Sequence, residues 1–305
     1  MIRYLFTRLA YMLPVVWLVV SVVFLLIHLV PGDPIQAMLG EGAAGSDLQA
    51  ARHAYGLDVP LPTQYVRYWN GVLHGDLGRS LRLNQPVRAL VAHAYPATLA
   101  LTVAALGFAV LLSIPAGVRS ATRRNYWDDR ALSFVSLLGL SVPNFALGPI
   151  LILVFAIRLD WLPVSGAQSW RNLVLPAITM GASLAAILTR MVRTSMLEEL
   201  GQDYIRTARA KGLSERAVVY RHALRNALIP VVTVLGLQFG ALLAGAIVTE
   251  TIFSWPGIGR LTINAISNRD YALVQGCLLC IGLTYVAVNF FTDLLYSALN
   301  PRIRQ

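Results

Sequence analysis

Residues that commonly do chemistry are few in this sequence, and none has the spacing of a catalytic motif. The chain contains a single lysine, Lys211, which follows Ala210 rather than a glycine. The phosphate-binding loop G-x-x-x-x-G-K-[ST] is therefore absent, and we expect no ATP binding by that route. No H-E-x-x-H run and no cluster of His, Cys, Asp and Glu has metal-ligand spacing. The sequence thus predicts a chain that is not an enzyme and holds no metal or cofactor of its own.

Two carboxylates lie within apolar segments, but their positions argue against transport driven by ion coupling. A proton- or sodium-driven carrier places several ionisable groups near the middle of the membrane. Glu250 and Asp293 instead lie near opposite edges of their apolar runs. For Asp293 we expect an ion pair with a basic residue at compatible depth, namely Arg8, Arg190 or Arg193. The driving force for transport must then come from another chain.

The composition identifies an integral membrane protein. Of the 305 residues, 56% are hydrophobic and 13% charged, and the mean hydropathy is +0.61, whereas charged residues make up about a quarter of soluble proteins. A net charge of +10 is compatible with nucleic-acid binding. We exclude that function because the arginines cluster in loops between apolar runs, where the positive-inside rule accounts for them. Cys277 and Cys280 lie in one apolar run, where we expect two small buried thiols rather than a redox or metal pair.

Six apolar runs are long enough to cross the roughly 30 Å hydrocarbon core as helices. They predict an all-α membrane protein with one domain over residues 1–305. The predicted spans cover about residues 9–30, 97–118, 131–157, 173–191, 230–253 and 274–299. Pro96 suits the first turn of the second span. Between the spans lie a long outer segment, residues 31–95, with a helix expected over residues 57–74, and a polar inner segment, residues 198–229.

Arginine positions set the orientation of these spans. Sixteen of the 25 Lys and Arg residues lie in the segments assigned to the inner side. The other nine lie in the outer segments, over a greater length: Arg52, Arg67, Arg79, Arg82, Arg88, Arg158, Arg171, Arg260 and Arg269. Because basic residues concentrate in cytoplasmic loops, both termini are predicted to be cytoplasmic.

Small and polar residues inside the spans suggest how the helices pack. Gly236, Gly240 and Ala244 recur every four residues, which predicts a seam where two helices approach closely. Pro143 breaks the third span, either as a packing kink or because it faces the bundle interior. Polar side chains in otherwise apolar spans are weak candidates for lining a transport route: Asn144, Thr179, Ser183 and Gln238.

The polar inner segment has local signals for two short helices joined at a glycine. Residues 203–211 have helix-forming composition, and Gly212 suits a helix C-terminus. Ser214 then offers an N-cap, with Glu215 in the first turn. The second helix places Ala217, Tyr220, Leu224 and Leu228 on one face, which must be buried against something.

Motifs in this segment resemble a known family. The runs Ala208-Arg-Ala-Lys-Gly212 and Arg221-His-Ala-Leu-Arg-Asn-Ala-Leu-Ile-Pro230 look like the cytoplasmic loop with which permease subunits of ABC importers engage their ATPase. The resemblance is closest to the peptide branch, which includes dipeptide, oligopeptide, glutathione and nickel permeases. Where the general importer pattern has Glu-Ala-Ala and Leu-Pro, this chain has Arg206-Thr-Ala208 and Leu224-Arg225. The similarity covers the full chain through further motifs: Val30-Pro-Gly-Asp-Pro34, Tyr55-Gly-Leu-Asp58, Gly75-Asp-Leu-Gly-Arg-Ser80, Pro256-Gly-Ile-Gly-Arg260 and Asn300-Pro-Arg302.

The resemblance implies the type I importer permease fold with a cytoplasmic coupling-helix loop, in a bacterial inner membrane. It also implies two ATPase subunits, which carry the ATP and Mg, and a soluble substrate-binding protein on the outer side. A second, homologous permease is expected because six helices with few polar groups seldom enclose a hydrophilic route alone. Residues expected to contact the ATPase are Tyr204, Ala208, Ala210, Gly212 and Leu213. Residues expected to tie the loop to the permease are Arg221, Arg225 and Asn226.

Dipeptides or short peptides are the expected substrates, with glutathione or nickel as alternatives, because the binding protein usually selects the substrate in this architecture. Two other classes of protein remain open from the sequence. One is a stand-alone secondary transporter or channel, and the other is a membrane scaffold or sensor. The polar inner segment has a simpler interpretation too, as a basic amphipathic hairpin lying on the inner lipid surface.

Overall fold

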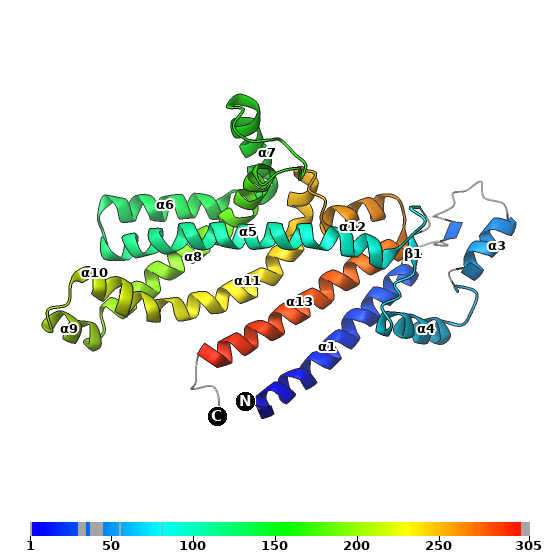
Figure 1. The fold of residues 1–305 in the computed structure, drawn as a ribbon, viewed down its shortest axis with the longest axis horizontal. Helices are drawn as coiled ribbons and strands as arrows, with labels where there is room; N and C mark the ends of the chain where they lie inside the picture. The colour runs from blue at the N-terminus through cyan, green and yellow to red at the C-terminus, as the bar shows by residue number, and fades with distance from the viewer. Residues whose placement is uncertain (1, 30–34, 37–44, 55, 81, 300–305) are drawn as a thin grey trace. The chain divides into compact units, whose positions relative to one another are not determined.

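The computed structural model describes residues 2–29, 35–36, 45–54, 56–80 and 82–299, and divides the chain into two compact units. Unit 1 comprises Met1–Thr98 and Pro256–Phe290, and unit 2 comprises Leu99–Trp255 and Phe291–Gln305. Two long helices, α5 (Val87–Thr122) and α13 (Tyr271–Leu299), contribute to both units (Figure 1). The motif segments 30–34 and 300–302, and Tyr55, lie outside the described residues.

Unit 1 is built on α1 (Ile2–Leu29) and the first part of α13. Val20 of α1 and Leu279 of α13 belong to one buried cluster, and Trp69 of α4 (Leu61–Leu73) packs against it. A Cβ atom on Gly282 would lie only 2.7 Å from Cγ1 of Val19, so this glycine permits the close approach of the two helices. The helix predicted over residues 57–74 is thus α4, and the outer segment contains a further helix, α3 (Gly45–Ala54).

A short hairpin and one further helix complete unit 1. Strands β1 (Arg79–Ser80) and β2 (Gln85–Pro86) pair antiparallel. The buried Ser80 hydroxyl donates a hydrogen bond to the buried carboxylate of Asp270, just before α13 begins. At the start of α12 (Ile258–Ser267), the Ile258 N–H donates to Thr98 Oγ1 at 2.8 Å. The first bond fixes the hairpin to the loop before α13, and the second fixes the start of α12 to α5.

Unit 2 is organised around α8 (Arg171–Leu200), which contacts α6 (Trp127–Ser141), α7 (Asn144–Leu151) and α11 (Leu224–Ile252). Glycines set the closest approaches. A Cβ atom on Gly181 of α8 would lie 2.6 Å from the carbonyl oxygen of Ala105 in α5. A Cβ atom on Gly236 of α11 would lie 2.2 Å from Cγ2 of Thr292 in α13. This contact confirms the predicted seam at Gly236; farther along α11, Gly240 is buried and Ala244 exposed.

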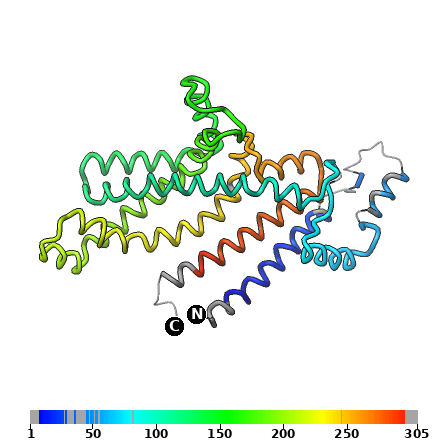
Figure 2. Tube along the Cα trace, in the orientation of Figure 1, coloured from blue at the N-terminus to red at the C-terminus, as the bar shows by residue number. Residues whose placement is uncertain are grey.

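The third predicted span is broken rather than kinked. Helix α6 ends at Ser141, and α7 begins after Pro143 in a direction that differs by 105°. α7 then continues as a π-helical segment, Ile152–Arg158. Proline disfavours an α-helical conformation for the residue before it, and Val142 is accordingly extended, which ends α6 at this point. Figure 2 shows α5 and α6 running side by side up to the turn between them, with the α7 segment diverging from the far end of α6.

Among the described residues, five helices are long and apolar enough to span a membrane, and six if the bent pair forms one span. Three helices extend beyond the expected spans. Helix α5 begins at Val87, so Pro96 lies inside the helix rather than in its first turn. Helix α11 begins at Leu224 as the continuation of earlier helical turns, so Pro230 lies inside the helix rather than at its start. Helix α8 likewise extends past the fourth expected span, to Leu200.

Candidate functional site

The polar inner segment folds as a bent element that we call the elbow, residues 201–217. It contains α9 (Asp203–Ala210), the turn at Gly212, and α10 (Glu215–Ala217). α10 continues without a break through a π-helical segment, Val218–Ala223, into α11. The elbow therefore connects α8 to α11 directly and lies at the end of both helices (Figure 1).

Gly212 forms the bend through a defined helix stop. Its φ is +77°, in the left-handed region that L residues rarely adopt. The Leu213 N–H donates to the Ala208 carbonyl at 3.3 Å, and the Gly212 N–H donates to the Arg209 carbonyl at 2.9 Å. These two bonds are the pair that defines a Schellman motif, in which glycine follows the last helical turn. The predicted stop at Gly212 is confirmed.

Two further contacts hold the second arm of the bend. The Ser214 hydroxyl accepts a hydrogen bond from the Ala217 N–H at 3.4 Å, as expected of an N-cap. Across the turn, Nε and Nη2 of Arg209 donate to the two carboxylate oxygens of Glu215 at 2.7 and 3.3 Å. The hydrogen bonds from the Glu215 carboxylate raise the pKa of the Arg209 guanidinium. Both arms of the elbow are thus joined by a bidentate ion pair.

One face of the elbow is part of the core of unit 2. Ile205 and Ala208 of α9 are buried in a cluster with Val218, with Met196 of α8, and with Val118 near the end of α5. The cluster spans four helices, so the elbow has little freedom to move separately from α8 and α5. The apolar face predicted for the second helix was only partly right. Ala217, Leu224 and Leu228 are partly buried but Tyr220 is 56% exposed, and the buried face is formed instead by Val218, Val219 and Ala223.

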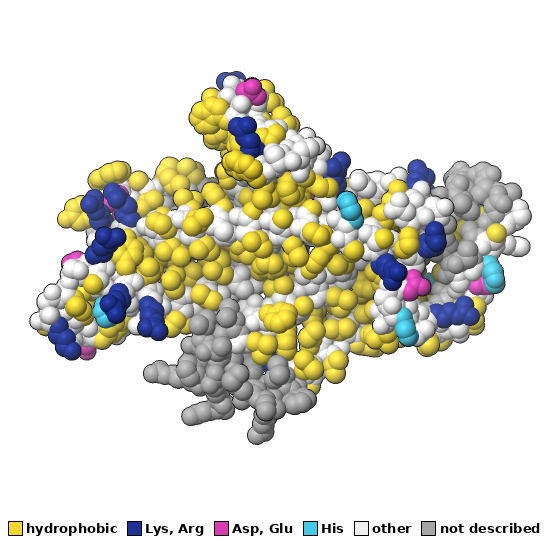
Figure 3. All heavy atoms as spheres, in the orientation of Figure 1, with side chains coloured by type: hydrophobic (Ala, Val, Ile, Leu, Met, Phe, Trp, Pro, Cys, Tyr) yellow, Lys and Arg dark blue, Asp and Glu magenta, His cyan; other side chains and the backbone are white. Residues whose placement is uncertain are grey.

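The opposite face of the elbow is exposed. Tyr204 is 39% and Leu213 42% exposed, and Ala210, Lys211 and Gly212 are also exposed. Ala208, expected beside them in the contact surface, is only 7% exposed and faces the core. Lys and Arg side chains gather over the elbow and over the nearby turn between α5 and α6 (Figure 3).

A polar network joins the elbow to the helices on either side of it. The Tyr204 hydroxyl donates to Oε2 of Glu199 at 2.5 Å and accepts from Nδ2 of Asn226 at 3.1 Å. Partial burial, together with the bond to Glu199, raises the pKa of Tyr204. Asn226 thus connects the start of α11 to α9. The other two residues expected to tie the loop to the permease, Arg221 and Arg225, have exposed side chains.

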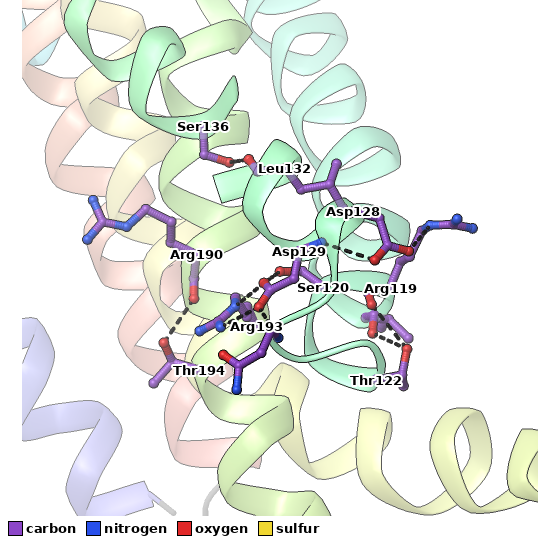
Figure 4. Close-up of polar contacts among 12 residues, drawn as sticks. Arg119, Ser120, Thr122, Asp128, Asp129, Leu132, Ser136, Arg190, Arg193 and Thr194 are labelled. Carbon is purple, nitrogen blue, oxygen red and sulfur yellow. Dashed lines mark hydrogen bonds and ion pairs between the residues drawn. The ribbon is translucent and has the colours of Figure 1, made fainter. Parts of the chain in front are cut away.

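A second polar site, the Asp129 junction, joins three helices next to the elbow (Figure 4). Nε and Nη2 of Arg193 on α8 donate to the two carboxylate oxygens of Asp129 on α6 at 2.7 and 2.9 Å. The same carboxylate accepts from the hydroxyl of Ser120 on α5 and from the Asn125 N–H at 2.9 Å. Asp129 is 3% exposed. A buried carboxylate with four donors is a fully satisfied, rigid connection.

Asp128, the neighbouring residue, is equally buried but connects fewer elements. Its Oδ2 accepts from Nε of Arg119 at 3.1 Å and from Nη1 of Arg123 at 3.4 Å. Both arginines belong to the end of α5 and the turn after it, and they are about half exposed. Asp128 therefore stabilises the turn between α5 and α6 without reaching α8.

Sequence reasoning missed this site. Arg193 had been expected as one of three partners for Asp293, but its partner is Asp129, 64 residues earlier in the chain. One signal was present: Asp128 and Asp129 are adjacent acids in a segment that also holds Arg119, Arg123, Arg124 and Arg130. Acids among so many cations at the inner end of a span are expected to pair with them.

The candidate pathway residues lie on three helices of unit 2. Asn144 is the first residue of α7, Thr179 and Ser183 lie on α8, and Gln238 lies on α11. Thr179 is buried, and its hydroxyl donates to the Leu175 carbonyl of its own helix at 2.8 Å. The other three are partly exposed. Within the described part of the chain, no hydrogen bond joins any two of the four.

Comparison with known proteins gives matches over the whole chain. A family model described as "Binding-protein-dependent transport system inner membrane component" matches residues 113–305, and a companion model for the N-terminal part of such components matches residues 1–102. The chain is 43% identical over 304 residues to proteins named "Glutathione transport system permease protein GsiC" from Escherichia coli strain K12 and from Pectobacterium atrosepticum. Each alignment covers 100% of this chain and 99% of the relative.

Two solved structures share the fold. One shows the MetNI methionine ABC transporter in an inward facing conformation, with a TM-score of 0.56 and 19% identity over 69% of this chain and 96% of that chain. The other shows an amino acid ABC transporter with histidines, with a TM-score of 0.55 and 12% identity over 69% of this chain and 94% of that chain. The helical fold is therefore the fold of importer permeases, as the sequence predicted.

Proposed function

The chain belongs to the family of binding-protein-dependent transport system inner membrane components, as an ABC importer permease of the peptide type, and on that premise we propose that it moves short peptides into the cytoplasm. It is a multi-pass inner membrane protein and a transport component that is not itself catalytic. The proposal adds the substrate class, the subunits that supply the energy, and the element through which they act.

Glutathione is the first candidate among short peptides. The observation that carries this choice is the 43% identity, over the full length of both chains, to permeases named for glutathione transport. Glutathione is itself a tripeptide, so it falls within the short-peptide class expected from the motifs. Dipeptides and nickel are the competing substrates. We propose that a soluble binding protein on the outer side delivers the peptide, because selection by such a partner fits a chain with few polar groups in its spans.

The elbow is proposed as the contact with the ATPase. Its exposed face presents Tyr204, Ala210, Lys211, Gly212 and Leu213, whereas its other face is buried in unit 2. An element that is exposed on one side and packed against several helices on the other transmits a push to those helices as a nearly rigid body. Two ATPase subunits, which bind the ATP and Mg, then act on this chain and on a second, homologous permease.

Transport follows from a change in helix packing between an inward-open and an outward-open state. ATP binding to the partner subunits favours one state through the contact of these subunits with the elbow. The equilibrium between the two states shifts by the difference in the free energy of that contact. Asn144, Ser183 and Gln238 are proposed to line the route, because their polar side chains are partly exposed within apolar helices. The Thr179 hydroxyl is a weaker candidate, since it bonds to its own helix.

Reconstitution tests the substrate and the energy source together. The tagged chain is purified from its native cell with its bound subunits and reconstituted in proteoliposomes with the binding protein. We expect uptake of labelled glutathione that requires both ATP on the elbow side and the binding protein. A matched labelled dipeptide and Ni²⁺ serve as competitors. Glutathione uptake without ATP would contradict the importer mechanism, and ATP-dependent uptake of dipeptide or nickel alone would contradict the choice of glutathione.

A further inference from the structure

The Asp129 junction occupies the place where force from the elbow would enter the rest of unit 2. α8 carries Arg193, and the same helix ends at Leu200, immediately before the elbow. Met196, one turn beyond Arg193, is buried in the cluster that contains Ile205 and Ala208 of the elbow. Displacement of the elbow therefore acts directly on this last part of α8.

Apolar packing links α8 to α5 near the elbow, whereas α6 packs on α8 farther from it, where a Cβ atom on Gly139 would lie 3.3 Å from Cβ of Ala186. A Cβ atom on Gly117 of α5 would lie 2.6 Å from Cβ of Val192, the residue before Arg193 on α8. Helices α5 and α8 are therefore in close contact beside the junction. The buried cluster shared with the elbow includes Val118 and Ala121 of α5, and it includes no residue of α6 among the described residues. At this end, α6 is joined to α8 through the bidentate contact between Arg193 and Asp129 (Figure 4).

We propose that Asp129 and Arg193 are positioning residues of the transport cycle, which make α6 move with α8 and the elbow when the ATPase acts. The Ser120 hydroxyl and the Asn125 N–H donate to the same carboxylate, so the end of α5 is held together with α6 and α8. Because α6 leads into the 105° break before α7, the junction passes motion at the elbow to the broken span. The inference rests on the proposed function of the elbow.

Asp129→Asn and Arg193→Lys test the junction. The amide keeps the shape of the carboxylate but removes the charge that accepts from Arg193, and lysine cannot make the bidentate contact. We expect assembled complexes that still hydrolyse ATP but move at least about fivefold less glutathione per ATP, the lower end of typical coupling effects. Asp128→Asn is the matched control, because the Asp128 carboxylate is as buried as that of Asp129 but does not reach α8.

A distance measurement on the same complexes decides the inference without relying on uptake. Spin labels are placed at Arg130→Cys on α6 and Arg190→Cys on α8, both exposed positions, in a background with Cys277→Ala and Cys280→Ala. With the junction intact, we expect one narrow distance distribution that is the same with and without ATP. In Asp129→Asn it should broaden or shift with ATP, whereas in Asp128→Asn it should stay narrow.

Three results would overturn the inference. One is an unchanged distance distribution in both Asp129→Asn and Arg193→Lys. Another is a parallel loss of assembly, ATP hydrolysis and uptake in both variants, which would show that the junction only stabilises the fold. The third is an equal effect of Asp128→Asn. If the unmodified complex itself shows no ATP-dependent uptake, the proposed function fails, and the distance measurement still shows whether Asp129 holds α6 to α8.

Discussion

Gly212 carries the backbone conformation on which the shape of the elbow depends. Its φ of +77° allows the two hydrogen bonds that end α9, and it turns the backbone toward α10. A left-handed conformation costs an L residue about 1–2 kcal/mol, and β-branched residues tolerate it least. No heavy atom lies within 4 Å of a Cβ atom built on Gly212, so the cost of a substitution comes from the backbone rather than from a clash.

Gly212→Val is expected to uncouple ATP hydrolysis from uptake. The elbow must straighten or distort to relieve the positive φ, and its exposed face then no longer fits the ATPase. We expect normal insertion into the membrane and at least about a fivefold fall in glutathione moved per ATP. The measurement is uptake and phosphate release in the same proteoliposomes.

Two matched variants separate backbone conformation from side-chain volume at this site. Gly212→Asn should retain most of the coupling, because asparagine tolerates the left-handed region. Gly201→Val should also retain most of the coupling. Gly201 is an exposed glycine before the start of α9, and its φ of −83° is one that an L residue adopts without strain. Full activity of Gly212→Val, or an equal loss in Gly201→Val, would exclude the left-handed turn as the cause.

Residues whose roles are set by their immediate neighbours could be predicted from the sequence, and residues whose roles depend on distant contacts could not. Gly212, Ser214 and Glu215 were placed correctly because caps and helix stops are local. The burial of Ala208 was missed, because it results from packing against α5 and α8. The role of Asp129 was missed for the same reason, since its partner is 64 residues away.

At the scale of helices, the contact between α5 and α8 determines how unit 2 is held together. Gly181 faces the carbonyl oxygen of Ala105, which would lie 2.6 Å from a Cβ atom. A backbone oxygen cannot rotate away as a flexible side chain can, so any side chain at this position must push the helices apart. Overpacking of this kind typically costs about 1–3 kcal/mol.

Gly181→Ala is therefore expected to lower the thermal stability of the purified chain, measured by tryptophan fluorescence on heating in detergent. Gly107→Ala is the matched control on α5, because a Cβ atom there meets no atom within 4 Å. Since alanine favours helix over glycine by about 1 kcal/mol, the control should be neutral or slightly stabilising. Equal melting temperatures for Gly181→Ala and Gly107→Ala would show that the two helices separate without cost.

The limits of sequence reasoning at this scale concern where helices begin and end. Each of the six apolar runs falls on helical structure, but hydropathy reports only the part of a helix in contact with apolar surroundings. α5 begins ten residues before the predicted residue 97, and α8 extends nine residues past the predicted residue 191, because both helices continue into polar segments. Pro143 was identified as an interruption, but the size of the bend depends on tertiary packing.

For the whole chain, the distribution of charge is the property that sets its orientation in the membrane. Sixteen of the 25 basic residues belong to the segments predicted to lie inside, and those segments include the elbow and the turn between α5 and α6. The mechanism proposed for the elbow requires this orientation, because ATP and the ATPase are cytoplasmic. If the elbow lay on the outer side of the membrane, it could not contact a cytoplasmic ATPase, and the proposed mechanism would be wrong even with the same fold.

Labelling of single cysteines in right-side-out vesicles tests the orientation. In the background with Cys277→Ala and Cys280→Ala, Lys211→Cys marks the elbow and Asn70→Cys marks the outer helix α4; both positions are exposed. A membrane-impermeant maleimide should modify Asn70→Cys in intact vesicles and Lys211→Cys only after permeabilisation, because basic segments are retained on the inner side. Arg124→Cys, in the turn between α5 and α6, should behave as Lys211→Cys does. The reverse pattern would place the elbow outside and contradict any contact between it and a cytoplasmic ATPase.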